Sequence, residues 1–173
     1  MFFKGGRGID FFQYSGEVGD NLKAVTSNGR DGVVLAFAEI GNEARFSTGG
    51  GDDIIAIGES EIGQDIEANT GGGDDIILLD TVEVDEDINA KTGSGNDFFA
   101  AIDVDVAVEA NLNFGSGNDD FYENGSDALS LRINGGSGFD RTNVPDLFVD
   151  DHRGFEDSDA DAALEQKLAD LFN

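Results

Sequence analysis

The sequence contains no cysteine and no tryptophan, one proline, one histidine and only 10 lysine and arginine residues. Without cysteine there are no disulfides and no thiolate metal sites, and one histidine is too few for a zinc or copper site with the usual ligands. No run of about 18 apolar residues could cross a membrane, and the first residues lack the apolar stretch of a signal peptide. We therefore expect no membrane insertion and no N-terminal signal peptide.

The chain is strongly acidic. Its 37 aspartate and glutamate residues give a formal net charge of -27. Because like charges repel, we expect cations and not nucleic acid as partners. Crowded carboxylates oppose folding unless counter-ions neutralise them, and the available ligands are oxygens, which suit a hard cation.

Glycine, with 25 residues, recurs in a six-residue turn at intervals of 21 or 22 residues. The seven copies are G-G-R-G-I-D (5–10), T-S-N-G-R-D (26–31), T-G-G-G-D-D (48–53 and 70–75), T-G-S-G-N-D (92–97), F-G-S-G-N-D (114–119) and G-G-S-G-F-D (135–140). All share glycine at the fourth position and aspartate at the sixth. Two short apolar segments lie between successive turns and have the composition of strands. Such a unit cannot bury its apolar face alone, so the period predicts stacked coils that share one core.

We therefore predict an all-β protein, a parallel β-helix or β-solenoid similar to a β-roll, with about seven coils of 21–22 residues. Its first inward ladder is expected to contain Phe12, Val33, Ile55, Ile77, Phe99 and Phe121, and its second Val18, Ile40, Ile62, Val84 and Val106, followed by Leu22, Ala44, Ile66, Ile88 and Ala110. The solenoid is expected to span residues 1–145. Residues 146–173 are expected to form a C-terminal cap with an amphipathic helix over 158–172, because their apolar residues have helical spacing.

An apolar stripe is expected on the outer side of the first strand. It contains Phe11, Val34, Ile54, Ile76, Leu78, Phe98 and Tyr122. A contiguous stripe of this kind is larger than a monomer normally exposes. The predicted helix, a second copy of the chain or a partner protein could cover it, and a homo-oligomer is the hypothesis to test first. Alternatively, a local bulge shifts the alternation of inward and outward residues.

The recurring x-Gly-x-Gly-x-Asp turn resembles that of the RTX, or haemolysin-type, calcium-binding repeats over residues 5–140. In that family calcium lies between successive turns, bound by backbone carbonyls and aspartate carboxylates. The resemblance implies aspartate ligands at Asp10, Asp31, Asp53, Asp75, Asp97, Asp119 and Asp140, further side-chain oxygens at Asp52, Asp74, Asn96 and Asn118, and turn glycines at Gly49, Gly51, Gly71, Gly73, Gly93, Gly95, Gly115 and Gly117. Arg7 and Arg30 place positive charge in the first two turns, so the central turns are expected to bind most strongly.

This chain departs from the nine-residue form of the family, because it has one glycine turn per 22 residues. Calcium is therefore expected along one edge only. The longer coil is similar to repeats of large surface-associated proteins of some marine bacteria. A metal-free solenoid, in which the aspartates hydrogen-bond their own turns, is the alternative.

The sequence thus predicts a calcium-binding structural or interaction module, not an enzyme, that takes several Ca²⁺ ions and is secreted or at the cell surface, with type I-like export possible. One alternative is a β-helix enzyme acting on polysaccharides, although its groove would need basic residues and tyrosines, and the chain has only Tyr14 and Tyr122. Another is a segment of a polymerising adhesin or fibre. His152 is not expected to be catalytic, because no nucleophile with recognisable spacing accompanies it.

Overall fold

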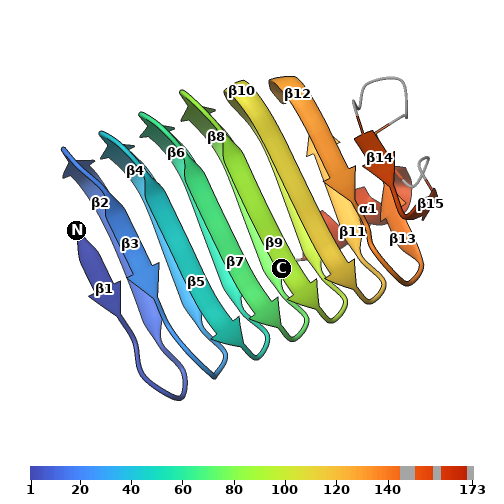
Figure 1. Ribbon diagram of the computed structural model, residues 1–173, viewed down its shortest axis with the longest axis horizontal. Coiled ribbons are helices and arrows are strands. Elements are labelled where there is room, and N and C mark those ends of the chain that lie inside the picture. The colour runs from blue at the N-terminus through green and yellow to red at the C-terminus, as the bar shows by residue number, and fades with distance from the viewer. Residues whose placement is uncertain (145–150, 158–160, 171–173) are drawn as a thin grey trace.

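The computed structural model describes residues 1–144, 151–157 and 161–170. Its strands pair in parallel within one 15-stranded sheet, which is wound into a solenoid (Figure 1). The strands are β1 (Phe2–Lys4), β2 (Phe11–Val18), β3 (Leu22–Val25), β4 (Gly32–Ile40), β5 (Ala44–Gly50), β6 (Ile54–Ile62), β7 (Ile66–Gly72), β8 (Ile76–Val84), β9 (Ile88–Ser94), β10 (Phe98–Ser116), β11 (Asp120–Asn124), β12 (Asp127–Asn134), β13 (Asp140–Thr142), β14 (Asp151–Arg153) and β15 (Phe155–Asp157), and the described helix is α1 (Asp161–Asp170).

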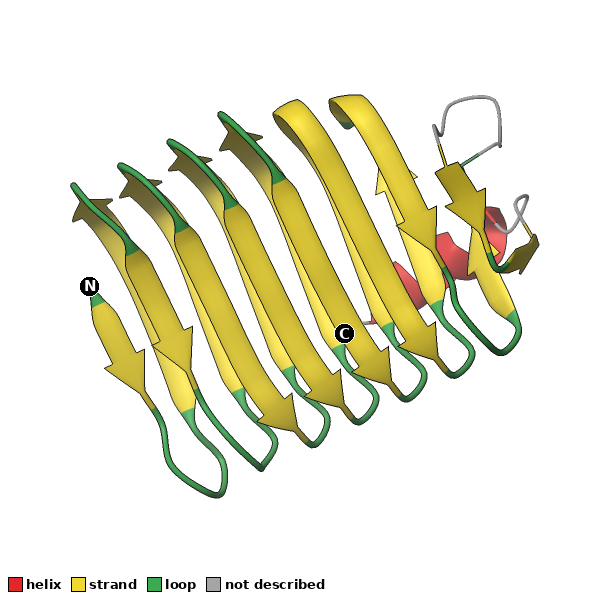
Figure 2. Cartoon of the chain, viewed as in Figure 1, coloured by secondary structure: helices red, strands yellow, loops and turns green. Residues whose placement is uncertain are grey.

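The strands alternate between two faces. The first face contains β2, β4, β6, β8, the first part of β10, β11, β13 and β15, and the second face contains β1, β3, β5, β7, β9, the last part of β10, β12 and β14. The glycine-rich turns lead from the second face to the first and line one edge, the lower edge in Figure 2. The predicted all-β solenoid is confirmed. It has about six coils and not seven, because seven turns in series enclose only six full repeats.

The core is a set of ladders along the solenoid axis. In the first ladder Ile55 pairs with Ile77, and Ile77 pairs with Phe99. All residues predicted for this ladder are at most 9% exposed. The Phe99 and Phe121 rings meet edge to face, with centroids 5.7 Å apart. The inward positions were therefore predicted correctly, because the 22-residue period aligns identical strand positions in successive coils.

The first-face strands β4, β6, β8 and β10 each bend at one residue with left-handed backbone geometry. These residues are Phe37, Glu59, Thr81 and Asp103, with φ values of 54°, 47°, 57° and 48°. The equivalent residue of the next coil is Gly125, also at positive φ. In β6 two successive residues face outward at the bend, so the alternation is displaced by one residue beyond it. This is a local β-bulge, the alternative that the sequence analysis allowed for the alternation of inward and outward residues.

The C-terminal segment adds strands to both faces. β14 pairs with β12, and β15 pairs with β13. The described helix α1 is shorter than the predicted 158–172, and both ends of that range, 158–160 and 171–172, lie outside the described residues. α1 lies on the outer side of the first face, behind the strands in Figure 2. No helix in the described part of the chain is long and apolar enough to cross a membrane.

Candidate functional site

Glycine is required at the second and fourth positions of the turns from 48–53 onward. Gly49 and Gly51 have φ values of 108° and 114°, which side chains other than glycine rarely adopt. A Cβ atom on Gly51 would overlap the carbonyl oxygen of Gly29 in the preceding coil. Gly50 differs, because a Cβ there would lie 3.7 Å from the nearest carbonyl oxygen. Glycine at the second and fourth turn positions therefore allows neighbouring turns to approach closely.

The sixth residues of the turns form a column inside this edge, here called the inner column. It contains Asp10, Asp31, Asp53, Asp75, Asp97, Asp119 and Asp140. From Asp31 onward these residues are at most 3% exposed. The backbone N–H of each aspartate donates to Oδ1 of the next aspartate in the column, over 2.7–2.9 Å. The structure thus brings all seven predicted aspartates into one line, although Asp10 is only half-buried.

The second oxygen of the buried carboxylates lacks a comparable partner. Oδ2 of Asp31, Asp53, Asp75, Asp97 and Asp119 is buried and accepts no hydrogen bond. The hydroxyls of Thr48, Thr70 and Thr92 lie beside the carboxylates of Asp53, Asp75 and Asp97. Each hydroxyl has one proton, which it donates to a backbone carbonyl of the next coil, over 3.4, 3.1 and 2.8 Å. A buried carboxylate oxygen without a partner is costly, so each of these atoms is a candidate ligand for a cation.

Burial raises the pKa of several inner-column carboxyls. It raises the pKa of Asp75 to about 6 and that of Asp119 to about 7, and it also raises the pKa of Asp53 and of Asp97. Backbone hydrogen bonds lower these pKa values in part, and the charges of neighbouring inner-column carboxylates raise the pKa of Asp75 and Asp119 further. Without a cation, part of the column therefore holds protons near neutral pH.

The fifth residues of the central turns form a second, exposed column, here called the outer column. It contains Asp52, Asp74, Asn96 and Asn118. Here the N–H of each later residue donates to Oδ1 of the earlier one, as in Asn96 to Asp74 (2.7 Å). This direction is opposite to that of the inner column. Each pair of adjacent central turns is therefore joined by two side-chain hydrogen bonds of opposite sense.

Some polar ladders were not assigned from the sequence. The buried threonines at the first position of the turns, such as Thr70, each donate to the carbonyl of the equivalent residue in the next coil. At the opposite edge, the N–H of Asp87 donates to Oδ1 of Asp65 (3.1 Å), and the N–H of Glu109 donates to Asp87 (3.0 Å). The recurrence of threonine at position one was a visible signal for the first ladder.

The glycine edge fits a calcium ion only if backbone oxygens contribute. Among the described residues, no three histidine, cysteine, aspartate or glutamate side chains lie close enough to one point to hold a metal ion by themselves. Calcium takes six to eight oxygens and accepts backbone carbonyls as readily as carboxylates. The buried Oδ2 atoms are anionic oxygens, and the carbonyl oxygens of Gly51, Gly73 and Gly95 lie against the next turn. The glycine edge therefore offers both kinds of oxygen that calcium takes as ligands.

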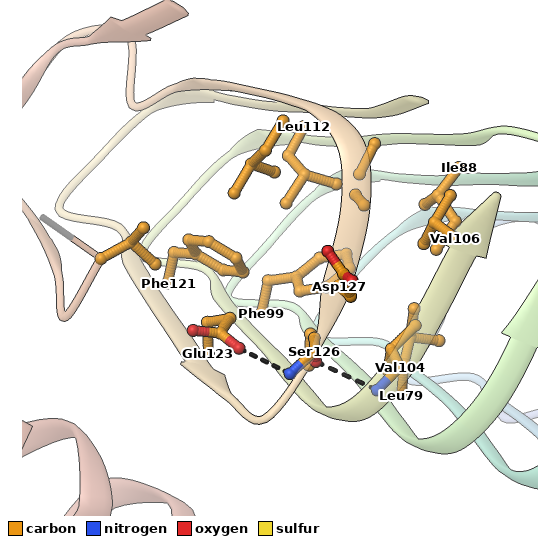
Figure 3. Close-up of a pocket in the computed structure, with 15 residues that line it drawn as sticks. Leu79, Ile88, Phe99, Val104, Val106, Leu112, Phe121, Glu123, Ser126 and Asp127 are labelled. Carbon is orange, nitrogen blue, oxygen red and sulfur yellow. Dashed lines mark hydrogen bonds between the residues drawn. The ribbon is translucent and has the colours of Figure 1, made fainter. Parts of the chain in front are cut away.

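Two hollows lie away from this edge. A groove of about 350 Å³ is lined by Glu39, Ile40, Gly41, Glu61, Ile62, Gly63, Glu83 and Asp85. This acidic lining differs from the basic and tyrosine-rich groove that a polysaccharide-active enzyme would need. The other, of about 490 Å³, lies at the C-terminal end of the core, where Phe99, Phe121 and Leu112 face it (Figure 3). Val144 also lines this hollow, and residues 145–150 lie outside the described part of the chain. The hollow therefore marks the place where the described core ends.

No protein-family model, curated protein or solved structure matches this chain. Any functional assignment therefore rests on the chain's own residues and on the geometry of the glycine edge.

Proposed function

We propose that the protein is a calcium-binding structural or interaction module, in which several Ca²⁺ ions along the glycine edge stabilise the folded solenoid. The observation that carries this proposal is the line of buried Oδ2 atoms without hydrogen-bond partners. In a protein interior such atoms are normally satisfied, and a divalent cation would satisfy them and neutralise the column. Burial of this much like charge without compensation would oppose folding.

The chain's own residues define where the ions bind. The inner column supplies one anionic oxygen per coil, and its Oδ1 atoms are already fixed by the N–H groups of the preceding coil. The carboxylates are therefore held in place before a cation arrives, which reduces the entropy lost on binding. Calcium, when bound, supplies the positive charge that allows neighbouring carboxylates to stay ionised. The turns with Asp52 and Asp74 have one more carboxylate each and are expected to bind most strongly.

Calcium binding would couple to folding. Binding to the folded state and not to the unfolded chain adds stability that grows with calcium concentration. Extracellular calcium modules work at about 10⁻⁴ to 10⁻³ M, far above cytosolic levels. We therefore also propose that the protein acts outside the cell or at its surface, where calcium would complete its folding.

The Asp75→Asn variant tests this proposal, with unfolding measured by circular dichroism in chelator and in millimolar calcium. Asparagine retains the Oδ1 acceptor for the N–H of Asp53 but removes a buried charge. In chelator the variant should be more stable than the native chain, by about 1 kcal/mol or more, because less charge is buried. In calcium it should be less stable, because one ligand is lost.

The matched control is Asp80→Asn, an exposed aspartate in the same coil. This variant should leave the gain in unfolding free energy between chelator and calcium nearly the same as in the native chain. If Asp75→Asn stabilises the protein equally in both conditions, the column is metal-free and the proposal fails. Magnesium serves as a second control, because it dehydrates reluctantly and prefers strict octahedral geometry.

A further inference from the structure

The apolar stripe on the first face is covered by α1 at its C-terminal end. Phe98, Ala100 and Tyr122 are at most 6% exposed and form a small cluster on which Leu168 of α1 packs. Phe98 and Tyr122, expected to be available to a second copy of the chain, are thus occupied within the same molecule. Towards the N-terminus the stripe is open, since Phe11 is 63% exposed. Part of the stripe therefore holds α1 in place.

A lysine fixes α1 to the outer side of β11. The Lys167 ammonium donates to Oδ2 of Asp120 over 2.7 Å and lies 5.0 Å from the centre of the Phe98 ring. Asp120 is buried and also accepts from Nε and Nη2 of Arg141, over 2.7 and 2.8 Å. One carboxylate thus pairs with two cations, so these three side chains together carry a net positive charge.

This positive charge lies beside the last carboxylates of the inner column. Asp97 and Asp119 directly precede Phe98 and Asp120, the two residues that Lys167 contacts. Because successive residues of a strand point to opposite sides of the sheet, the column and Lys167 lie on the two sides of the same pair of strands. Burial raises the pKa of Asp97, and the charge of Lys167 acts in the opposite direction. The field of the lysine therefore reaches the column.

We propose that calcium and α1 compete at this end of the glycine edge, so that calcium bound at Asp97 and Asp119 loosens α1 from the first face. This coupling rests on the calcium-binding function proposed above. Whether the carboxylates are ionised or protonated beforehand, a bound Ca²⁺ makes their surroundings more positive, and a docked ammonium is then less stable beside them. Because coupling between two binding equilibria is reciprocal, docked α1 weakens calcium binding at this end by the same factor.

Glu165 and Asp170 of α1 are acidic but act on the column less than Lys167 does. Both are exposed, and Asp170 accepts a hydrogen bond from Gln166 over 2.8 Å. Solvent and salt weaken the interaction of exposed charges with the column. Lys167 is half-buried against β11, so its charge acts on the column more directly.

The C-terminal turns are also the turns in which one neighbouring charge matters most. Asn96 and Asn118 stand where the central turns have Asp52 and Asp74, so calcium there has fewer anionic ligands. We expect these turns to fill after the central turns as calcium rises. The helix α1 is then docked at low calcium and released as the last turns fill.

A calcium titration of the full chain followed by NMR tests this coupling, with the amides of Gly51 and Gly117 reporting on a central and a C-terminal turn. Lys167→Met removes the charge and should lower the calcium concentration at the midpoint for Gly117 about fivefold, with no change for Gly51. Lys167→Arg retains the charge and should titrate as the native chain does. Lys23→Met, at an exposed position in β3 at the other end of the solenoid, removes the same charge and should leave both midpoints nearly unchanged.

The reciprocal measurement is hydrogen exchange in α1 of the native chain. Exchange in α1 should be about fivefold faster at saturating calcium than at a concentration that fills the turn of Gly51 but not that of Gly117, while exchange in β6 does not accelerate. A midpoint for Gly117 that Lys167→Met leaves unchanged or raises would overturn the coupling and leave calcium binding intact. A native chain without any calcium-dependent shift would refute the calcium-binding function itself, and this coupling with it.

Discussion

At the scale of single residues, backbone geometry decides more than residue type. The turn glycines were expected, because the motif repeats in every coil. The left-handed residues Phe37, Glu59, Thr81 and Asp103 were not, because they share no chemical property. Their conformation is imposed by the closure of the coil, and side chains other than glycine or asparagine accept it only at a cost of about 1–2 kcal/mol.

Replacement of Phe37 by glycine should stabilise the protein. Phe37 is 66% exposed at a φ of 54°, so little apolar burial is lost and the backbone strain is relieved. Glycine costs roughly 0.5–1 kcal/mol in chain entropy, which leaves a net gain of about 0.5–1 kcal/mol. Urea unfolding in calcium measures it. Leu129→Gly, at an exposed position without positive φ, is the control and should destabilise by about 1 kcal/mol.

Neighbouring glycines of one turn should differ strongly. Gly51→Ala places a methyl group onto the carbonyl oxygen of Gly29 at positive φ, and we expect a loss of about 3 kcal/mol or more. Gly50→Ala meets only an ordinary contact and should change stability by less than about 1 kcal/mol. Thermal unfolding in calcium compares them. Equal losses would contradict the close approach of Gly51 to the carbonyl oxygen of Gly29.

At the scale of secondary-structure elements, the sequence predicted the strands and the C-terminal helix, but not where that helix packs. The strands follow from a period that repeats six times, so an error in one coil is corrected by its neighbours. The position of α1 depends on contacts between segments far apart in the sequence. Leu168 packs on the cluster of Phe98, Ala100 and Tyr122, and the Lys167 ammonium donates to Asp120 over 2.7 Å. The repeat contains no signal for either contact. The opposite directions of the hydrogen bonds in the inner and outer columns were also not predictable, because they depend on which way each carboxylate or amide side chain points. The pairing of β14 with β12 lies beyond the last recognisable turn.

The docking of α1 should depend on Lys167. Lys167→Met retains an apolar side chain beside Phe98 but removes the ion pair with Asp120, which keeps its ion pair with Arg141. We expect the helix to dock less favourably by about 1–2 kcal/mol. Hydrogen exchange should then show faster opening of α1, with exchange in β6 unchanged. Gln166→Met, at an exposed position on the same helix, is the control. Uniform loss of protection throughout the solenoid would contradict a local role.

At the scale of the whole molecule, like charge is organised into columns. Besides the inner column, Glu39, Glu61 and Glu83 pair in register on the first face. Directly opposed like charges destabilise a sheet, and here they recur in successive coils. The molecule therefore responds as a unit to protons and to cations, because each changes many equivalent sites together.

Stability without calcium should decrease as pH rises. The folded pKa values of Asp75 and Asp119, about 6 and about 7, exceed the value of about 3.9 in an unfolded chain. The folded state therefore binds more protons between these values, and stability present in acid is lost as pH rises through 6 and 7. In chelator, the thermal midpoint should be higher near pH 5 than near pH 8 by roughly 5 °C or more.

In millimolar calcium this dependence should weaken or reverse, because protons compete with the cation for the same oxygens. Scanning calorimetry at the two pH values, with and without calcium, measures all four midpoints. A midpoint in chelator that rises with pH would show that the inner column is ionised without penalty.

The opposite senses of the two columns have a consequence for the length of the molecule. Each junction between central coils is completed by groups from the two coils it joins, as in Asp53 with Asp75 and Asp74 with Asp52. If residues 54–75 were duplicated or lost, the new neighbours would present the same donors and acceptors to each other. Genes of this kind can therefore gain or lose 66 nucleotides in frame, one coil of 22 residues at a time, and still encode a chain whose junctions are satisfied.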